Sequence, residues 1–292
     1  MKLALFGKDI REKNKEYLIR LIRRLKEYDA ELLVHESYYP GISEICKSFD
    51  ITDTFKGYDD LAGNTDMVLS IGGDGTLLDT VSLVRDSGIP VLGINLGRLG
   101  FLSSISCDDL IPAIDKVMAG QYTRDQRTLL KLESKKGLFG EFSYALNDLT
   151  VTRKDSTALV VIHVYVDNLF LNSYWADGLI VATPTGSTAY SMSSGGPIVS
   201  PGSENFVITP IAPHNLTIRP IVVSDKSEIR ISVEGRDKKF LVSIDSKTDI
   251  LNSGDELILK TADFKFNLVQ IENKDFFTTI RDKLKWGLDV RN

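Results

Sequence analysis

The sequence predicts a two-domain protein, in which an α/β N-terminal domain with a parallel sheet is followed by a mostly antiparallel β-sandwich C-terminal domain. The length of 292 residues corresponds to about two domains at roughly 150 residues each. Short apolar runs alternate with helical stripes over about the first hundred residues, which is typical of a parallel sheet covered by helices. Many short strand-like segments at close spacing follow, as in a sandwich.

The expected parallel sheet alternates with helices from the N-terminus onward. Apolar runs predict strands at 2–7, 31–35, 67–71 and 89–94. Apolar residues at the spacing of a helix face predict helices over 18–25 and 42–49 and another from Thr76. Pro90 falls near the beginning of its strand, where proline is tolerated.

The pattern changes after Leu102. Residues 110–118 still form one helical stripe, but strands then dominate, and we place the domain boundary near residue 100. The candidate strands are 128–134, 143–153, 158–166, 169–174, 178–183, 206–212, 228–233, 239–244, 256–260 and 264–271. The first domain is therefore expected over 1–100 and the sandwich over 101–271, with an apolar helical stripe in the tail after them.

Composition limits the possible partners. Lys and Arg number 35 against 40 Asp and Glu, and the net charge of −5 argues against a general binder of nucleic acid or anionic membranes. Cys46 and Cys107 are far apart and fit neither a disulfide framework nor a zinc site. We see no charged N-terminal segment followed by a long apolar stretch, and no membrane-length apolar run, so we expect a cytoplasmic protein.

A glycine-rich turn follows the third strand. Residues 72–76, Gly-Gly-Asp-Gly-Thr, expose backbone amides where a helix begins, and the positive end of that helix favours a phosphate. The turn matches neither the P-loop nor the usual dinucleotide fingerprint. Asp74 has two interpretations. It caps the helix, or it hydrogen-bonds an acceptor hydroxyl, orients it towards a γ-phosphoryl group and takes its proton.

Two further segments carry polar groups in unusual places. Residues 177–191 run from a strand into a hydroxyl-rich turn whose side chains could bind phosphate or ribose, with Tyr190 against an adenine ring. The alternative is a capped helix with a core tyrosine. Asn147 and Asp148 interrupt an apolar strand, so one of them points into the core and needs a partner, such as a ligand ribose or amide. A strand-end turn is the alternative.

Taken in order along the chain, these motifs resemble the NAD kinases. The Gly-Gly-Asp-Gly turn is shared more loosely with phosphofructokinases and diacylglycerol-type lipid kinases. Residues 95–102 resemble the segment that joins the family's two domains, and 212–222 match a further family stretch. Residues 177–197 resemble the family's most specific block, which lipid kinases lack in this form.

The resemblance implies an enzyme that transfers the γ-phosphoryl group of ATP to the 2′-hydroxyl of the adenosine ribose of NAD, yielding NADP and ADP. It implies a divalent cation, with Mg²⁺ expected, and a homo-oligomer (dimer or tetramer), while the composition leads us to expect no nucleic-acid or membrane partner. It also implies an active site between the domains and a tail, 272–292, that docks back on the first domain. The alternatives are a diacylglycerol-type lipid kinase and a non-catalytic NAD(P) sensor in which Asp74 only caps a helix.

The same resemblance assigns roles to individual residues. Asp74 is the catalytic aspartate, while Asn147 and Asp148 hold the ribose and nicotinamide side of the acceptor. Further nucleotide-binding residues are Gly72, Gly73, Gly75, Thr76, Asp177, Thr188, Ala189, Tyr190, Ser191, Met192, Ser193 and Ala212. No residue is implied as a metal ligand.

This chain also departs from the family pattern. Asp148 stands where glutamate is common, so its shorter side chain needs a water or a closer ribose. Lys247 stands where many members have glutamine, and we keep it as a binding candidate that adds a cation near a phosphate. No basic residue follows Thr76, so donor-phosphate binding would depend more on backbone amides and Mg²⁺.

Overall fold

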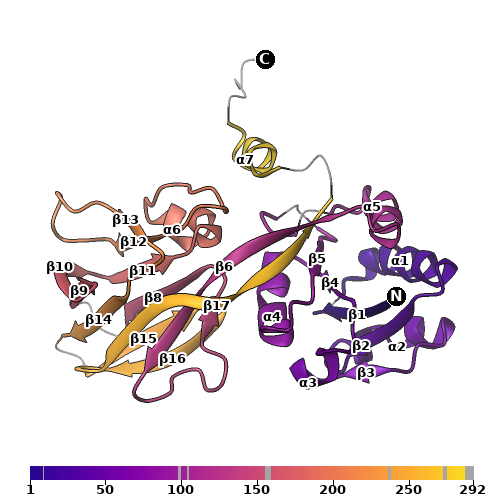
Figure 1. Ribbon diagram of the computed structural model, residues 1–292, viewed down its shortest axis with the longest axis horizontal. Coiled ribbons are helices and arrows are strands. Elements are labelled where there is room, and N and C mark those ends of the chain that lie inside the picture. The colour runs from indigo at the N-terminus through magenta and orange to yellow at the C-terminus, as the bar shows by residue number, and fades with distance from the viewer. Residues whose placement is uncertain are drawn as a thin grey trace. The chain divides into compact units, whose positions relative to one another are not determined.

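We describe a computed structural model of the chain, which covers residues 1–8, 10–97, 100–103, 105–154, 159–235, 238–271 and 275–286. The chain forms two compact units. One comprises Met1–Gln126 with Phe266–Asn292, and the other comprises Arg127–Lys265. Figure 1 labels the elements of both units. The strands β6 (Thr123–Ser134) and β17 (Glu256–Gln270) each run from one unit into the other.

The first unit contains a parallel sheet with the strand order β17-β5-β4-β1-β2-β3. Its other strands are β1 (Lys2–Gly7), β2 (Glu31–His35), β3 (Thr54–Phe55), β4 (Met67–Ile71) and β5 (Val91–Ile94). Its helices are α1 (Lys15–Glu27), α2 (Tyr39–Ser48), α3 (Tyr58–Leu61), α4 (Asp74–Val84), α5 (Leu110–Met118) and α7 (Phe276–Leu284), and a short 3₁₀ helix spans Glu12–Asn14. The predicted parallel α/β arrangement is confirmed.

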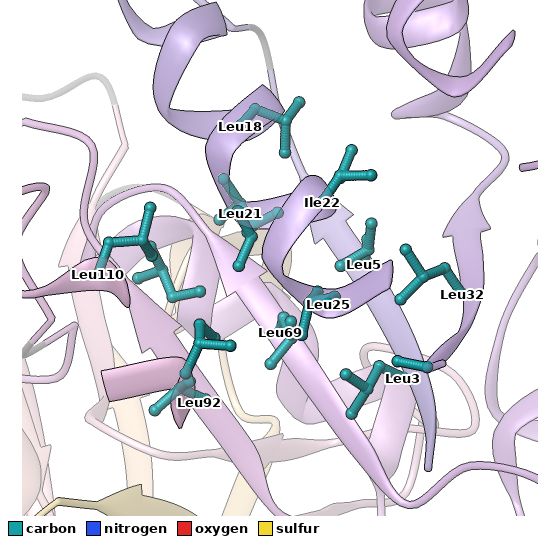
Figure 2. Close-up of a cluster of buried hydrophobic side chains, with 14 of the residues drawn as sticks. Leu3, Leu5, Leu18, Leu21, Ile22, Leu25, Leu32, Leu69, Leu92 and Leu110 are labelled. Atoms are coloured by element: carbon teal, nitrogen blue, oxygen red, sulfur yellow. The ribbon is translucent and has the colours of Figure 1, made fainter. Parts of the chain in front are cut away.

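The apolar stripe of α1 explains why this helix packs on the sheet. Leu18, Leu21, Ile22 and Leu25 recur on one face and are buried in the same core as Leu3, Leu5 and Leu69 of the strands, as Figure 2 shows. Every residue of β4 is buried, as expected for a central parallel strand covered on both faces.

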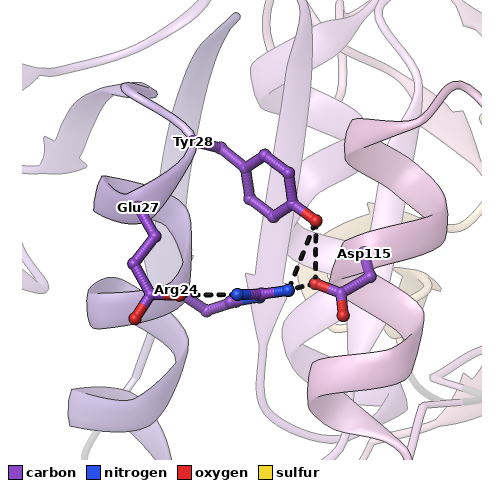
Figure 3. A network of polar contacts seen from close by, with 4 residues as sticks. All are labelled: Arg24, Glu27, Tyr28 and Asp115. Atoms are coloured by element: carbon purple, nitrogen blue, oxygen red, sulfur yellow. Dashed lines mark hydrogen bonds and ion pairs between the residues drawn. The ribbon is translucent and has the colours of Figure 1, made fainter.

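Helix α5 extends the first unit beyond the expected boundary near residue 100. Its apolar residues Leu110 and Ile114 lie in the core of the first unit. A polar network also links α5 to α1: Arg24 Nε donates to Asp115 Oδ1 at 2.6 Å, and Tyr28 Oη donates to the same oxygen at 3.2 Å (Figure 3). Residues 101–126 therefore fold with the first unit, because the stripe over 110–118 completes that core.

The second unit consists of two sheets. One has the order β13-β12-β11-β8-β15-β16, and the other contains β10-β9-β14-β17 together with β6 and β7. The strands not yet introduced are β7 (Tyr144–Ala145), β8 (Asp148–Arg153), β9 (Val160–Val166), β10 (Leu169–Ala176), β11 (Gly178–Ala182), β12 (Asn205–Ile211), β13 (Ile221–Ser224), β14 (Ile229–Glu234), β15 (Lys239–Ile244) and β16 (Lys247–Asn252). The pairings among β8–β16 are antiparallel. Alternate residues of both sheets form one core, as in a sandwich.

Several predicted strands differ from the observed ones. The segment predicted as one strand over 143–153 is interrupted between β7 and β8, and 256–270 form one strand where two are predicted. The predictions lack strands β13 and β16, because their apolar runs, 221–223 and 250–251, are only three and two residues long. The start of the strand predicted over 158–166 and the end of the tail lie outside the described residues. No helix among the described residues is long and apolar enough to cross a membrane.

The tail helix α7 belongs to the first unit, which includes the chain from Phe266 onward. Its Ile280 is buried, and Lys283 Nζ lies 5.9 Å from the centre of the Phe101 ring. The expected docking of the whole tail, 272–292, stays a prediction, because residues 272–274 and 287–292 lie outside the described part of the chain.

Candidate functional site

The glycine-rich turn leads directly from β4 into α4. A Cβ atom on Gly72 would lie 2.8 Å from Thr76 Cβ, so only glycine fits at this position. Gly73 and Gly75 are exposed, and a Cβ on either would meet nothing within 4 Å. Thr76 is buried beneath the turn. The open side of the turn is therefore the side of Gly73 and Gly75, where a phosphate can approach the start of the helix.

The carboxylate of Asp74 accepts hydrogen bonds from three consecutive backbone amides. Phe101 N donates to Oδ2 at 2.7 Å, and Leu102 N and Ser103 N donate to Oδ1 at 3.1 and 2.9 Å. Asp74 is the first residue of α4, the N-cap is Gly73, and no side chain caps the helix. The helix-cap interpretation of Asp74 is therefore wrong. Because a carboxylate offers about four lone-pair sites, one acceptor position remains for a ligand hydroxyl.

A cavity of about 500 Å³ lies beside this turn, within the first unit. Gly72 and Gly73 form part of its wall, and Lys8 and Arg11 bring two cationic side chains to it. Lys8 Nζ also pairs with Asp79 Oδ2 at 2.6 Å. The cavity thus combines turn amides and cations, which suits a polyanionic ligand.

Lys8 and Arg11 are not among the predicted site residues, although the strand pattern carries a signal for Lys8. Gly7 at the end of β1 pairs with Ile71 at the end of β4, so Lys8 follows one strand where Gly72 follows the other. Residues that follow neighbouring parallel strands meet at the same edge of the sheet, which is where ligands of open α/β sheets bind. The cation next to the first strand could therefore have been placed beside the turn.

In the second unit, Asn147 and Asp148 lie at the junction of β7 and β8. Asp148 is 8% exposed, and Thr150 Oγ1 donates to its Oδ1 at 3.0 Å. Burial raises the pKa of Asp148 to about 6, although the hydrogen bond from Thr150 acts in the opposite direction. Asn147 is half-buried. The chain therefore bends here and one of the two side chains is buried with Thr150 as its partner, while a ligand contact of this pair stays a prediction.

The hydroxyl-rich segment forms a 3₁₀ turn, Thr185–Thr188, followed by the short helix α6 (Tyr190–Ser193). Tyr190 is 46% exposed, so the alternative of a core tyrosine is wrong. Ser191 is buried, and its Oγ lies 2.9 Å from Thr209 Oγ1, which gives it a structural partner. Thr188 donates its hydroxyl to Thr185 O.

The remaining candidates are Asp177, Ala189, Met192, Ser193, Ala212 and Lys247. Asp177 N donates to Ile211 O at 2.9 Å, which brings Asp177 beside the exposed Ala212. Asp177 also pairs with Arg153 at 3.3 Å. Met192 is half-buried, Ala189 is half-buried and Ser193 is exposed. Lys247 is exposed and lies over the Phe142 ring, with its Nζ 5.5 Å from the ring centre.

Among the residues whose placement is described, no group of three or more His, Cys, Asp or Glu side chains is arranged to hold a metal ion. Proteins commonly bind Mg²⁺ through one or two carboxylates together with substrate phosphates. The turn and cavity of the first unit are compatible with a cation that arrives on the phosphates of a nucleotide.

Comparison with known proteins covers nearly the whole chain. Residues 3–122 match the model of the ATP-NAD kinase N-terminal domain, and residues 146–271 match that of the ATP-NAD kinase C-terminal domain. The chain is 45% identical to an NAD kinase of Cytophaga hutchinsonii over 295 residues and 42% identical to one of Flavobacterium psychrophilum over 294, with 100% of each chain covered.

Solved structures show the same fold. Yeast NADH kinase in complex with NADH aligns with a TM-score of 0.86 at 28% identity, covering 99% of this chain and 89% of that one. An NAD kinase from Archaeoglobus fulgidus in complex with ATP aligns with a TM-score of 0.75 at 24% identity, covering 98% and 99% of the two chains.

Proposed function

The chain belongs to the ATP-NAD kinase family, and from this we infer that it transfers the γ-phosphoryl group of ATP to the 2′-hydroxyl of the adenosine ribose of NAD. The products are NADP and ADP. The proposal for the site depends on the geometry of Asp74. Three backbone amides hold its carboxylate at the start of α4, and about one acceptor position stays free for a substrate hydroxyl.

On the donor side, we assign the phosphates of ATP to the cavity beside Gly72 and Gly73. Lys8 and Arg11 supply charge there, and the amides of the turn and the N-terminus of α4 supply donors. Mg²⁺ would arrive as part of the nucleotide substrate and neutralise charge between the β- and γ-phosphates.

On the acceptor side, we assign NAD to Asn147, Asp148 and the segment around Asp177, Thr188 and Tyr190. Tyr190 supports this assignment because its ring is exposed and can stack on an adenine. The buried Ser191 holds its neighbours in place and would contact NAD only through its backbone.

The proposed chemistry transfers one proton and one phosphoryl group. The 2′-hydroxyl donates a hydrogen bond to Asp74 and attacks the γ-phosphorus, so that the new bond between O2′ and phosphorus forms as the bond to the bridging oxygen of ADP breaks. The proton passes to the Asp74 carboxylate. Because the transition state of phosphoryl transfer is loose, positioning and charge neutralisation contribute most of the rate.

The test is Asp74→Asn in a coupled assay in which an NADP-specific dehydrogenase reports the product. We expect turnover to fall by roughly 10²–10⁴-fold with NAD binding retained, the usual range for lost general-base assistance. Asp86→Asn is the matched control, since Asp86 is exposed and its Oδ1 accepts a hydrogen bond from Tyr58 Oη at 2.8 Å. Near-normal turnover of Asp74→Asn would show that Asp74 does not act as the general base.

The same assay separates the alternative functions. A lipid kinase would phosphorylate diacylglycerol in place of NAD, and a sensor would bind NAD without forming NADP. The family match favours NAD as the acceptor over both alternatives.

A cytoplasmic location and a homo-oligomeric state are further proposals. The two cysteines are unpaired, which suits a reducing compartment. Light scattering after gel filtration measures the number of subunits directly.

A further inference from the structure

The backbone between β7 and β8 is held by one distant carboxylate. Leu146 N donates to Asp245 Oδ2 at 2.8 Å, and Asn147 N and Asp148 N donate to Oδ1 at 2.8 and 3.2 Å. Asp245 follows β15 and lies 97 to 99 positions further along the chain. Three consecutive amides thus converge on a single side chain.

The carbonyl groups of the same three residues are also bonded. Thr183 Oγ1 donates to Leu146 O at 2.5 Å, and Thr183 N donates to Asn147 O at 2.8 Å. Asp245 N donates to Asp148 O at 3.1 Å. Six backbone polar groups are therefore satisfied by only two residues, Thr183 and Asp245.

Gly186 closes the other side of this segment. A Cβ atom on Gly186 would lie 2.7 Å from Asn147 Cα and closer still to its carbonyl group, so no side chain fits between them. The backbone of Asn147 is consequently fixed from two directions. Its side-chain amide is only half-buried and makes no hydrogen bond within the described ranges of the chain.

We propose that Asp245 is a positioning residue of the acceptor site, which acts with Thr183 to fix residues 146–148 so that the Asn147 and Asp148 side chains meet the dinucleotide. The proposal rests on the proposed function, because it takes Asn147 and Asp148 as contacts of NAD. A fixed backbone limits the directions in which the side-chain amide of Asn147 can point, which lowers the entropy lost when NAD binds.

A carboxylate is the side chain that this role requires. Both of its oxygens accept, and three amide donors point at them. An asparagine has one oxygen, and its NH₂ group would face at least one backbone N–H as a second donor. Asp245→Asn should therefore release part of the segment while preserving the size of the side chain.

The first experiment compares Asp245→Asn with Asp249→Asn in the full-length enzyme. Asp249 is the matched control, because its carboxylate accepts hydrogen bonds from the backbone amides of Phe139 at 3.3 Å and Ile250 at 2.7 Å, neither of which belongs to 146–148. For Asp245→Asn we expect the KM for NAD to rise roughly 10- to 100-fold, the loss that corresponds to one hydrogen bond to a charged group. The KM for ATP and kcat at saturating NAD should stay within about threefold. Asp249→Asn should leave the KM for NAD unchanged.

A second pair of variants distinguishes a loss of positioning from a general folding defect. Thr183→Val removes the hydroxyl that donates to Leu146 O, whereas Thr183→Ser keeps it. We expect the valine variant to raise the KM for NAD and the serine variant to restore it. The proposal is overturned if the KM for NAD is unchanged in both Asp245→Asn and Thr183→Val, or if the KM for ATP rises equally.

Hydrogen exchange supplies a readout that does not depend on turnover. In Asp245→Asn, the amides of Leu146, Asn147 and Asp148 should exchange faster, while the β4 amides keep their protection. Unchanged exchange at all three amides would also overturn the proposal. If the wild-type chain formed no NADP from ATP and NAD, the proposed function would fail. Exchange and equilibrium NAD binding would still decide whether Asp245 positions this segment.

Discussion

Gly100 lies against the Asp74 carboxylate with no room for a side chain. An ideal Cβ on this glycine would lie 2.7 Å from Asp74 Oδ2 and closer still to the other atoms of the carboxylate. Gly100→Ala therefore forces either the carboxylate or the backbone of 100–103 to move. We expect this single methyl group to slow the reaction by displacing the Asp74 carboxylate.

The required movement sets the size of the effect. Ordinary van der Waals contact of a Cβ begins at about 3.4 Å, so Oδ2, the farthest of the three carboxylate atoms, must retreat by 3.4 − 2.7 = 0.7 Å, and Oδ1 must move further. Misplacing a reacting group by about 1 Å can cost about 100-fold in rate. We therefore expect kcat to fall about 100-fold, which corresponds to about 2.7 kcal/mol of activation free energy. The KM values for ATP and NAD should change much less.

The assay is the steady-state formation of NADP by Gly100→Ala, by Asp74→Asn and by the double variant. If Gly100 acts only through Asp74, the double variant should be no slower than Asp74→Asn alone, because residues that act as a unit are not additive. Gly41→Ala is the control, since a Cβ on Gly41 would meet nothing within 4 Å. Additive losses in the double variant, or an unchanged kcat in Gly100→Ala, would refute the proposed link between Gly100 and Asp74.

Two further predictions concern stability. Leu69 is fully buried in the core of the first unit, so Leu69→Ala should lower the free energy of unfolding by about 2–5 kcal/mol in urea denaturation, and a loss below about 1 kcal/mol would contradict the packing described. Burial raises the pKa of Asp148 to about 6 from 3.8, so the folded chain holds a proton that the unfolded chain has lost between these pH values. The stabilisation from this proton is complete below about pH 3.8 and is lost as the pH rises through about 6, which amounts to about 3 kcal/mol between the two limits. Asn does not titrate, so the stability of Asp148→Asn should not show this loss, and the free energy of unfolding of the variant minus that of the wild type should increase from pH 5 to pH 7.5. An equal difference at both pH values would contradict the shift.

The parts of the fold that depend on local pattern could be predicted from the sequence. The apolar stripe at Leu18, Leu21, Ile22 and Leu25 predicts α1 and the face that it buries, because a helix repeats every 3.6 residues. The glycine-rich turn before α4 is equally local. The boundary predicted near residue 100 lies before helix α5, which packs with α1 in the core of the first unit. Because α1 lies about ninety residues earlier in the chain, no local pattern shows this packing.

The candidate site also has a part that the sequence predicts and a part that it does not. Asp74 and its turn are contiguous, so the motif predicts their grouping. The amides that hold the Asp74 carboxylate lie 27 to 29 positions later, and no periodicity links the two segments. Asp245 is absent from the predicted site residues, because its relation to 146–148 depends on β15 pairing with β8 so that Ile244 lies opposite Leu149. Register between strands distant in sequence is set by the folded sheet.

Asp74 and Asp245 show that the same hydrogen-bonding arrangement can serve two different roles. Each carboxylate accepts three consecutive backbone amides, so hydrogen bonding alone does not distinguish them. Their surroundings do. Asp74 stands beside exposed glycines at the start of a helix, where a substrate hydroxyl can reach its remaining acceptor position. Asp245 is half-buried, and burial, together with the nearby Asp148, raises the pKa of its carboxyl to about 7 against the effect of its amide donors. The amide partners of Asp245 belong to the segment that carries Asn147, which suits Asp245 to fixing that backbone, whereas Asp74 lies at a turn with exposed glycines, which suits it to receiving a proton from a bound hydroxyl.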